Sequence, residues 1–299
     1  MKHAVATSLG APCGVAVVCG ELGLARSSYY AELAATISPP VPPAKRGPKT
    51  AYTDEALTGH IRRVIEESPF SGEGHRKVWA RLRRKGIRTS KARALRLMRL
   101  AGLLAPSRAR KASQAKAHDG RIVTKAPDEM WGTDATRAYT LEDGPVTVFI
   151  GVDHCTAECV GIHAAKVGNR FEALEPIRQG LREHFDGYEK DVAKGLKVRH
   201  DHGSQYMSDH FQAELRFLGI ESSPAFVREP EGNGCAERFI LTLKQQVLWV
   251  ECFRNVEELR KALLAFKDLY NRQWLIERLG HITPAAARAK LGRGRKDAA

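Results

Sequence analysis

The chain has 299 residues, 43% of them hydrophobic, which is enough for one sizeable core and one or two small domains. No run of 18 or more apolar residues occurs, so a membrane-spanning helix is excluded on length. Six cysteines without a C-x-x-C pair favour reduced thiols in a cytoplasmic protein over a disulfide framework. The net charge of +14 indicates an anionic partner.

The positive charge is concentrated in one segment. Residues 62–125 carry 19 Lys or Arg against four Asp or Glu, whereas residues 1–61 carry five against four and residues 126–299 carry 24 against 26. A basic block beside a near-neutral half is typical of a protein in which one region binds a polyanion and the other has a different task. A solvated basic face is the simpler alternative.

The first 52 residues predict a helical segment followed by a linker. The stretch 21–35 has a helical pattern, with Gly23 as a turn and Ser27 or Ser28 as a possible helix cap, so we assign residues 1–38 to a partial helix-turn-helix. Four prolines between positions 39 and 43, followed by Gly-Pro, break regular structure and predict a linker over residues 39–52.

Residues 53–105 predict a small helical domain. Apolar spacing predicts a first helix from Asp54 that ends before Pro69, a second over 74–85, and a third that begins after Ser90 as N-cap. Three short helices of this kind match a helix-turn-helix, in which the last helix enters the major groove of DNA. A helical bundle with a solvated face is the alternative.

Arginines line the third predicted helix. Arg93, Arg96 and Arg99 recur every three residues, which makes them candidate DNA contacts. The following residues, 106–126, are rich in Lys and Arg with few large apolar groups and predict a basic linker.

Beyond residue 127 the pattern becomes that of an α/β domain. The expected strands cover residues 131–139, 146–153, 160–165 and 196–200, and the expected helices cover 170–184, 208–218, 233–249 and 256–270. The order of these elements, with strands first and helices mainly afterwards, predicts a mixed sheet flanked by helices. We assign residues 127–288 to this α/β domain and residues 289–299 to a basic tail that is disordered or touches DNA.

Three acidic residues stand where such a fold would bring them together. Asp134 lies in the first strand, Asp201 directly follows the short fourth strand, and Glu237 lies in the first turns of a helix. Strand ends and helix starts around one sheet edge are where α/β proteins place catalytic groups. The spacing of Asp201 and Glu237 alone is weak support, because about one such pair is expected by chance in this composition.

The residues around these acids resemble the integrase superfamily, and more closely the transposases of the insertion-sequence-three family. The matching blocks occur in the family's order over residues 127–290: WGTD at 131–134, RHDHGSQY at 199–206, PEGNGCAERF at 230–239 with LK at 243–244, and YN at 270–271. Weaker agreement with the family's helix-turn-helix lies upstream, in LGLARSSYY at 22–30, HRKV at 75–78 and RLMRLAGL at 96–103.

The resemblance implies an RNase H-like core that cuts and joins DNA at the ends of a mobile element, with Mg²⁺ or Mn²⁺ as cofactor. Double-stranded DNA, further copies of the chain and an upstream-frame protein are the implied partners, because related elements often express two frames and this chain resembles the downstream one. The implied location is the bacterial cytoplasm, at the nucleoid. In the family the residue before the second Asp is often Ser, whereas here it is His200.

Phosphodiester chemistry explains the need for three carboxylates. Two hard cations about 4 Å apart stabilise charge on the attacking and leaving oxygens when carboxylates hold them. We therefore expect Asp134, Asp201 and Glu237 to be the catalytic residues and the metal ligands. Asp153, at the end of the second strand, is left out because the resembling family does not use the acid there as a metal ligand.

Other residues near the acids are candidate DNA contacts. Lys244 lies seven residues after Glu237, so two helical turns place it on the same face, where it can bind a phosphate. Gln205 follows Asp201, and Asn233 is expected to cap its helix first and to contact substrate second. His200 and His202 also invite a zinc site, which the spacing of the cysteines does not support.

Two other functions fit parts of the sequence. A domesticated relative that binds DNA without cutting it would keep the helix-turn-helix and lose metal binding. A nuclease of the same fold acting on RNA–DNA hybrids would have no need of the basic block before the core.

Overall fold

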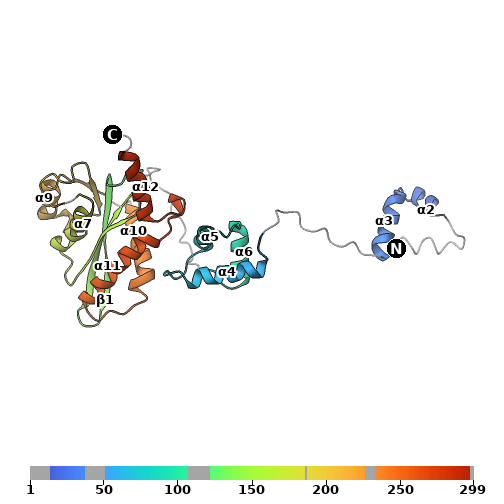
Figure 1. Cartoon of the computed structure of the whole chain (residues 1–299), viewed down its shortest axis with the longest axis horizontal. Helices are drawn as coiled ribbons and strands as arrows, with labels where there is room; N and C mark the ends of the chain where they lie inside the picture. The colour runs from blue at the N-terminus through green and yellow to red at the C-terminus, as the bar shows by residue number, and fades with distance from the viewer. Residues whose placement is uncertain (1–13, 38–50, 107–121, 186, 226–232, 297–299) are drawn as a thin grey trace. The chain divides into compact units, whose positions relative to one another are not determined.

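The computed structural model describes residues 14–37, 51–106, 122–185, 187–225 and 233–296, with side chains as far as residue 292. The chain divides into two compact units, residues 1–50 and residues 51–299, and each is described by itself (Figure 1). Most of both predicted linkers lies outside the described residues. In the part of the chain that is described, no helix is both long and apolar enough to cross a membrane.

The first unit contains two short helices, α2 (Val15–Glu21) and α3 (Arg26–Ile37). Gly23 lies between them with a φ of 61°, and the Leu24 N–H donates to the Cys19 carbonyl at 2.8 Å. The predicted turn at Gly23 is therefore confirmed. The predicted cap is wrong, because Ser27 and Ser28 lie inside the first turn of α3.

Three capped helices form the predicted small domain: α4 (Asp54–Glu66), α5 (His75–Arg84) and α6 (Lys91–Leu100). The Ser90 hydroxyl accepts a hydrogen bond from the Arg93 N–H at 3.1 Å, as its predicted N-cap role requires. The helices enclose their own core of buried apolar side chains, formed by Leu57, Ile61, Val64, Val78, Leu82, Ile87, Leu97 and Met98. All three predicted helices are confirmed.

The larger domain is built on one five-stranded sheet. Its strands are β1 (Met130–Thr140), β2 (Gly144–Asp153), β3 (Cys159–Ala165), β4 (Lys197–His200) and β5 (Glu221–Pro224), in the spatial order β3-β2-β1-β4-β5. The first three strands are antiparallel, and β4 and β5 run parallel to β1. A mixed sheet with this order confirms the predicted RNase H-like fold class.

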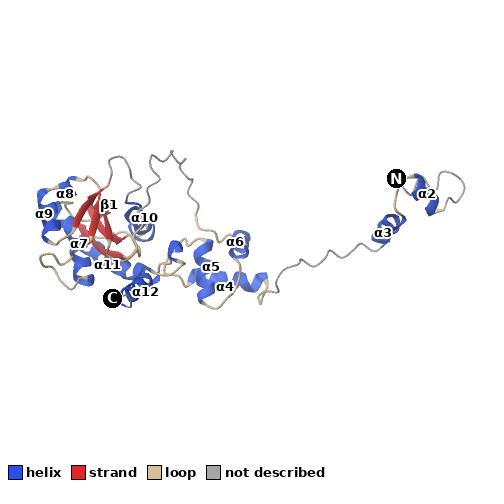
Figure 2. Ribbon diagram, turned by 90° about the horizontal axis from the view of Figure 1, so that it is seen from above, coloured by secondary structure: helices blue, strands red, loops and turns tan. Residues whose placement is uncertain are grey.

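Helices cover both faces of the sheet (Figure 2). One face packs against α7 (Arg170–His184), α8 (Ser204–Met207) and α9 (Asp209–Phe217), and the other against α10 (Gly234–Leu243) and α11 (Val256–Gln273). Side chains alternate along β2, so that Phe149 faces the first group while Val148 and Ile150 face the second. Burial on both faces explains why this strand is a nearly continuous apolar run.

Several elements differ from the sequence prediction. The expected helix over 233–249 is α10 followed by a π-helix, η2 (Lys244–Leu248), and the expected helix over 208–218 is preceded by the separate short helix α8. Strand β5 was not predicted, because a run of Glu-Ser-Ser-Pro has no strand pattern and is held only by its pairing with β4.

The predicted basic tail is also different. Residues Pro284–Lys296 form helix α12 instead of a disordered segment. Arg288 donates to both carboxylate oxygens of Asp128, at 2.6 and 3.0 Å, and also pairs with Glu158. The many basic residues of this segment suggested a disordered tail. The helix was missed because it is held by ion pairs from Arg288 to residues 130 or more positions earlier in the chain.

The three-helix domain contacts the larger domain through the segment between α4 and α5. Phe70 is 4% exposed and belongs to the core shared by α10 and α11, with its ring edge-on to that of Trp274 at 4.8 Å. The Gln246 side chain accepts from the Ser71 N–H and donates to the Ser71 carbonyl, each at 3.0 Å. Phe70 therefore joins this segment to the core of the larger domain, and Arg76 of α5 adds an ion pair with Glu277, while the three helices keep a separate core of their own.

Candidate active site

Asp134 lies in the middle of β1, between β2 and β4. Its neighbour Thr133 is buried and donates its hydroxyl to the Ile150 carbonyl at 2.8 Å, which fixes this part of β1 against β2. The Ala135 N–H donates to the Asp134 carboxylate at 2.7 Å. Asp134 thus lies on the central strand of the sheet, which is paired on both sides.

Asp201 follows β4, the parallel neighbour of β1. Gly132 pairs with Arg199 in the register, so Asp134 and Asp201 each lie two residues beyond the last paired position. Asp201 is exposed, and its carboxylate accepts a hydrogen bond from the Gly203 N–H at 2.8 Å. His200 just before it is buried, and its Nε2 lies 2.9 Å from the Ser222 hydroxyl on β5.

Glu237 projects from the first turns of α10. The opposite side of this helix buries Ala236, Phe239 and Leu243 against the sheet. Glu237 and Lys244 line one cleft together with Asp134, as their seven-residue spacing predicts. The cleft has a volume of about 300 Å³ and is completed by Ala135, Thr136, Ile240, Leu241 and Trp249.

The charges of Asp201 and Glu237 both act on Asp134. Burial, together with these two negative charges and against the Ala135 N–H and Lys244, raises the pKa of Asp134 to about 6. Burial also raises the pKa of Glu237. Asp201 does not line the cleft itself, but its charge reaches Asp134. Partly buried, mutually repelling carboxylates fit a divalent cation, which prefers hard oxygen ligands and would remove the repulsion.

Asn233 departs from its predicted role. It stands at the N-cap position of α10, but its side chain makes no capping hydrogen bond. Its amide instead donates to the Thr133 carbonyl at 2.8 Å, and the residue is 7% exposed. The start of α10 is therefore tied directly to β1, one residue before Asp134. Whether Asn233 or the half-buried Gln205 touches DNA stays a prediction.

The arginines of α6 differ in their surroundings. The Arg93 side chain is 17% exposed and donates to Asp54 at 2.9 Å and to the Tyr52 carbonyl at 2.8 Å. Arg96 also pairs with Asp54, at 2.6 Å, while its side chain remains 52% exposed. Arg99 is exposed. Arg93 and Arg96, two of the three predicted DNA contacts, therefore tie α6 to the start of α4. A DNA phosphate would have to compete with Asp54 for these two side chains.

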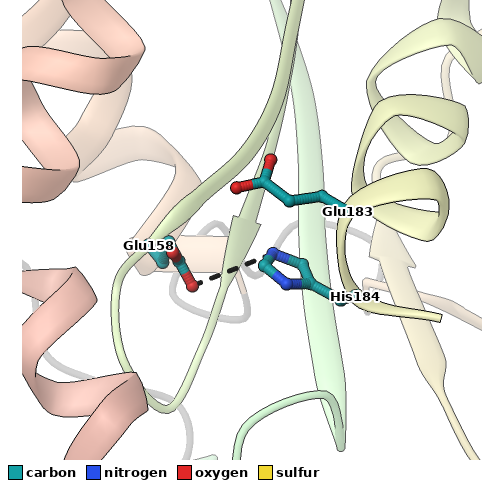
Figure 3. A group of neighbouring side chains, drawn as sticks. All are labelled: Glu158, Glu183 and His184. Atoms are coloured by element: carbon teal, nitrogen blue, oxygen red, sulfur yellow. Dashed lines mark ion pairs between the residues drawn. The ribbon is translucent and has the colours of Figure 1, made fainter. Parts of the chain in front are cut away.

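Another group of ligand-type side chains lies away from the cleft. Among the described residues, the carboxylates of Glu158 and Glu183 and the His184 ring lie within 4.8 Å of one another (Figure 3). Arg288 already pairs with Glu158, and Lys267 pairs with Glu183 at 2.7 Å. These cations balance the carboxylates, so the group is an ion-pair network that links α7, α11 and α12. His200 and His202 belong to no such group in the described part of the chain, which leaves the zinc alternative unsupported.

Sequence reasoning missed the wall of the cleft. Trp249, Leu241 and Thr136 line it with the acids, but nothing in their spacing distinguishes them from ordinary surface or core positions. Trp249 was assigned only to the end of a regular helix. The π-helix that precedes it has no recognised sequence signal.

Comparison with known proteins gives consistent matches. Residues 53–111 match the family described as HTH-like domain, and residues 218–284 match the integrase core domain. The chain is 30% identical over 283 residues to the transposase for insertion sequence element IS629 of Shigella sonnei, covering 92% of this chain and 91% of that protein. It is 28% identical over 208 residues to transposase InsD of the IS2 elements of Escherichia coli, covering 68% of each chain.

Solved structures that are similar in shape are retroviral integrases. A chain of the simian T-cell lymphotropic virus intasome in complex with PP2A regulatory subunit B56 gamma has a TM-score of 0.46 at 16% identity, and the match covers 70% of each chain. The catalytic core domain of BIV integrase has a TM-score of 0.41 at 16% identity, covering 56% of this chain and 99% of that one.

The helix-turn-helix, the mixed sheet and the acidic cleft define a polynucleotidyl transferase of the integrase type. The family match is specific in both parts of the chain, because the DNA-binding and the catalytic regions each match and the long alignment runs through both. The chain belongs to the insertion-sequence transposases of the insertion-sequence-three family. This membership implies dependence on a divalent metal ion.

Proposed function

We propose that this transposase cuts the ends of its own mobile element and joins them to target DNA at the cleft formed by β1 and α10. The observation that carries the proposal is that acids from three separate elements converge on Asp134 of β1: Glu237 from α10 lines one cleft with it and Lys244, and the charge of Asp201, after β4, acts on it. Unrelated surface acids would not be expected to converge in this way.

The roles of the side chains follow from their positions. Asp134 is the central ligand, because the other two acids both act on it, and Asp201 and Glu237 would each complete one of two metal positions. Two divalent ions held there would stabilise charge on the attacking and leaving oxygens of the phosphodiester. Lys244, on the same wall of the cleft as Glu237, provides a positive charge for a DNA phosphate.

The remaining parts of the chain deliver and assemble the DNA. Helix α6, with Arg93, Arg96 and Arg99, recognises the terminal repeats of the element within a domain over residues 53–105. The core over 127–288 carries the chemistry, and the segments 1–38 and 106–126 supply a partial helix-turn-helix and a basic connection. Joining two element ends requires two active sites, so the working form is a homo-oligomer on DNA at the bacterial nucleoid, with an upstream-frame protein as a further partner.

Strand transfer by the purified chain tests the proposal. The substrate is a duplex that carries the element's terminal repeat, with Mg²⁺ or Mn²⁺, and wild type is compared with Asp201→Asn. We expect metal-dependent joining that falls by about 10²- to 10³-fold in the variant, the loss typical when one group that supports transition-state charge is removed, because Asp201 would hold the cation that stabilises this charge. DNA binding should remain, since Asp201 carries no positive charge.

Asp209→Asn is the matched control, because Asp209 is also an exposed aspartate, at the start of α9, and is not among the charges that act on Asp134. Full activity of Asp201→Asn would remove that residue from the site. Tight DNA binding with no joining by wild type would indicate either that an upstream-frame partner is required or that the protein is a catalytically inactive, domesticated relative. Adding the upstream-frame protein separates these two outcomes.

A further inference from the structure

Two buried polar atoms meet beside the strand that carries Asp134. The His154 Nε2 and the Asn233 Oδ1 are both shielded from solvent, and neither has another hydrogen-bond partner in the described part of the chain. A Cβ placed on Gly132 would lie 2.4 Å from the Asn233 oxygen and 2.7 Å from the His154 nitrogen, so the two atoms are close neighbours. Because a buried polar atom without a partner is costly, two such atoms side by side are expected to satisfy each other.

The two side chains come from separate elements that meet at β1. His154 directly follows the last residue of β2, and Asn233 directly precedes α10, which carries Glu237. The nitrogen of the Asn233 amide donates to the Thr133 carbonyl at 2.8 Å, so its oxygen is the atom that faces His154. A line of contacts therefore runs from the end of β2 through the start of α10 to β1.

Gly132 leaves the room that this pair occupies. It is buried in the sheet, paired with Val152 on β2 and with Arg199 on β4. A side chain at this position would begin within 2.7 Å of both polar atoms, closer than Cβ atoms approach their neighbours in folded proteins. It would displace the Asn233 amide, which explains why a residue without a side chain stands two positions before Asp134.

We propose that His154 is a positioning residue for the catalytic acids: its Nε2–H donates to the Asn233 Oδ1, and the amide fixed in this way holds the start of α10 against β1. Without this donor the amide could turn its oxygen toward the Thr133 carbonyl, and two acceptors would then repel each other. The start of α10 would move from β1 and carry Glu237 away from Asp134. This inference rests on the proposed function of the cleft.

The surroundings of His154 favour a neutral ring in one tautomer. Burial, together with the positive charges of Arg199 and Arg278 and against the hydrogen bond with Asn233, lowers the pKa of His154 to about 4. A neutral imidazole carries one N–H, and an amide oxygen can only accept. The proposed contact therefore requires the proton to be on Nε2, which is a property that can be measured directly.

The first test is the ring tautomer, which requires neither metal nor DNA. Nitrogen NMR of histidine-labelled protein at neutral pH distinguishes Nε2–H from Nδ1–H, and the spectrum of His154→Leu identifies the His154 signals. We expect the Nε2–H tautomer in wild type and loss of this preference in Asn233→Ala. The Nδ1–H tautomer in wild type would overturn the proposal, because Nε2 could not then donate.

The second test is strand transfer with rescue. His154→Leu removes the donor, whereas the amide nitrogen of His154→Gln can take the place of Nε2. We expect the rate at saturating DNA to fall by about 10- to 100-fold in His154→Leu, the loss typical of a group that supports metal ligands, with unchanged affinity for the terminal repeat. His154→Gln should regain most of the rate. His154→Leu should add little to the loss in Asn233→Ala, because both remove the same contact.

His163→Leu is the matched control. His163 is also half-buried, its Nε2 lies 2.6 Å from the Glu172 carboxylate, and it does not line the cleft. The control should not slow strand transfer by the folded protein. Equal losses in His154→Leu and His154→Gln, or additive losses in His154→Leu and Asn233→Ala, would overturn the positioning role. An inactive wild type would contradict the proposed function, while the tautomer would still decide whether His154 donates to Asn233.

Discussion

At the scale of single residues, the acids could be predicted from sequence, whereas their supporting contacts could not. Asp134 was expected in the first strand, Asp201 after the fourth and Glu237 at a helix start, and the structure has them there, with the charges of Asp201 and Glu237 acting on Asp134. Their roles as catalysts and metal ligands stay a prediction. The hydrogen bond from Asn233 to the Thr133 carbonyl could not be predicted, because it joins residues 100 positions apart. An Asn before a helix is most often a cap, and local pattern alone offers no other role.

Asn233→Ala tests whether that contact positions the active site. The substitution removes the Asn233 amide that donates to the buried Thr133 carbonyl. We therefore expect the free energy of unfolding to fall by about 1–3 kcal/mol and the rate of strand transfer to fall as well. Urea denaturation and strand-transfer assays measure the two effects. Asn255→Ala is the control, because Asn255 caps α11 with its side chain on the Glu258 N–H and loss of a cap costs about 1 kcal/mol. If both variants lost activity in proportion to stability, Asn233 would have no positioning role.

At the scale of elements, helices with strong apolar periodicity were predicted to within a residue or two. Helices α4, α5, α6 and α7 have clear apolar faces, and all but α5 begin with a side-chain N-cap. The misses are elements whose stability comes from distant partners, namely β5 through its pairing with β4 and α12 through the ion pairs of Arg288. The arginine spacing of α6 was visible in the sequence, but the partner of Arg93 and Arg96 at Asp54 was not.

Substitutions of the α6 arginines should therefore distinguish residues that contribute to DNA affinity from residues that contribute to the folding stability of the three-helix domain. Arg99→Ala is expected to weaken DNA binding and to reduce the slope of log affinity against log salt by about 1, because one phosphate contact is lost. Arg93→Ala should mainly destabilise the three-helix domain, since its side chain already binds Asp54 and the Tyr52 carbonyl. Fluorescence anisotropy across a salt series and thermal melts distinguish the two. An unchanged salt slope for Arg99→Ala would place DNA recognition on another surface.

At the scale of the whole molecule, the fold class followed from the order of strands and helices, but the contact between the domains did not. Phe70 lies in a short segment between α4 and α5 that reads as an ordinary loop, yet it is buried in the core of the catalytic domain. A single aromatic residue in a loop gives no sequence signal of the surface it will cover. The division between the two units at residues 50–51 falls within the predicted linker over residues 39–52.

Phe70→Ala should loosen the three-helix domain from the core. Large-to-small substitution of a buried Phe costs about 3–5 kcal/mol, and here the loss falls on the shared core and not on the three-helix core. We expect calorimetry to show two separate unfolding transitions in the variant where wild type shows one. Phe217→Ala, at a phenylalanine that is 46% exposed, is the control and should change little. A single unchanged transition in Phe70→Ala would show that the domains are held together by other contacts.

The π-helix between Lys244 and Leu248 has a consequence for how this region tolerates change in length. The Trp249 N–H bonds to the carbonyl five residues back, one residue more than in an α-helix, so deleting one residue from Lys244–Leu248 would restore ordinary helical bonding and leave Trp249 near its present side of the helix. Adding one residue to an α-helix instead turns everything after it by about 100°. This turn should therefore tolerate the loss of one residue better than the gain of one.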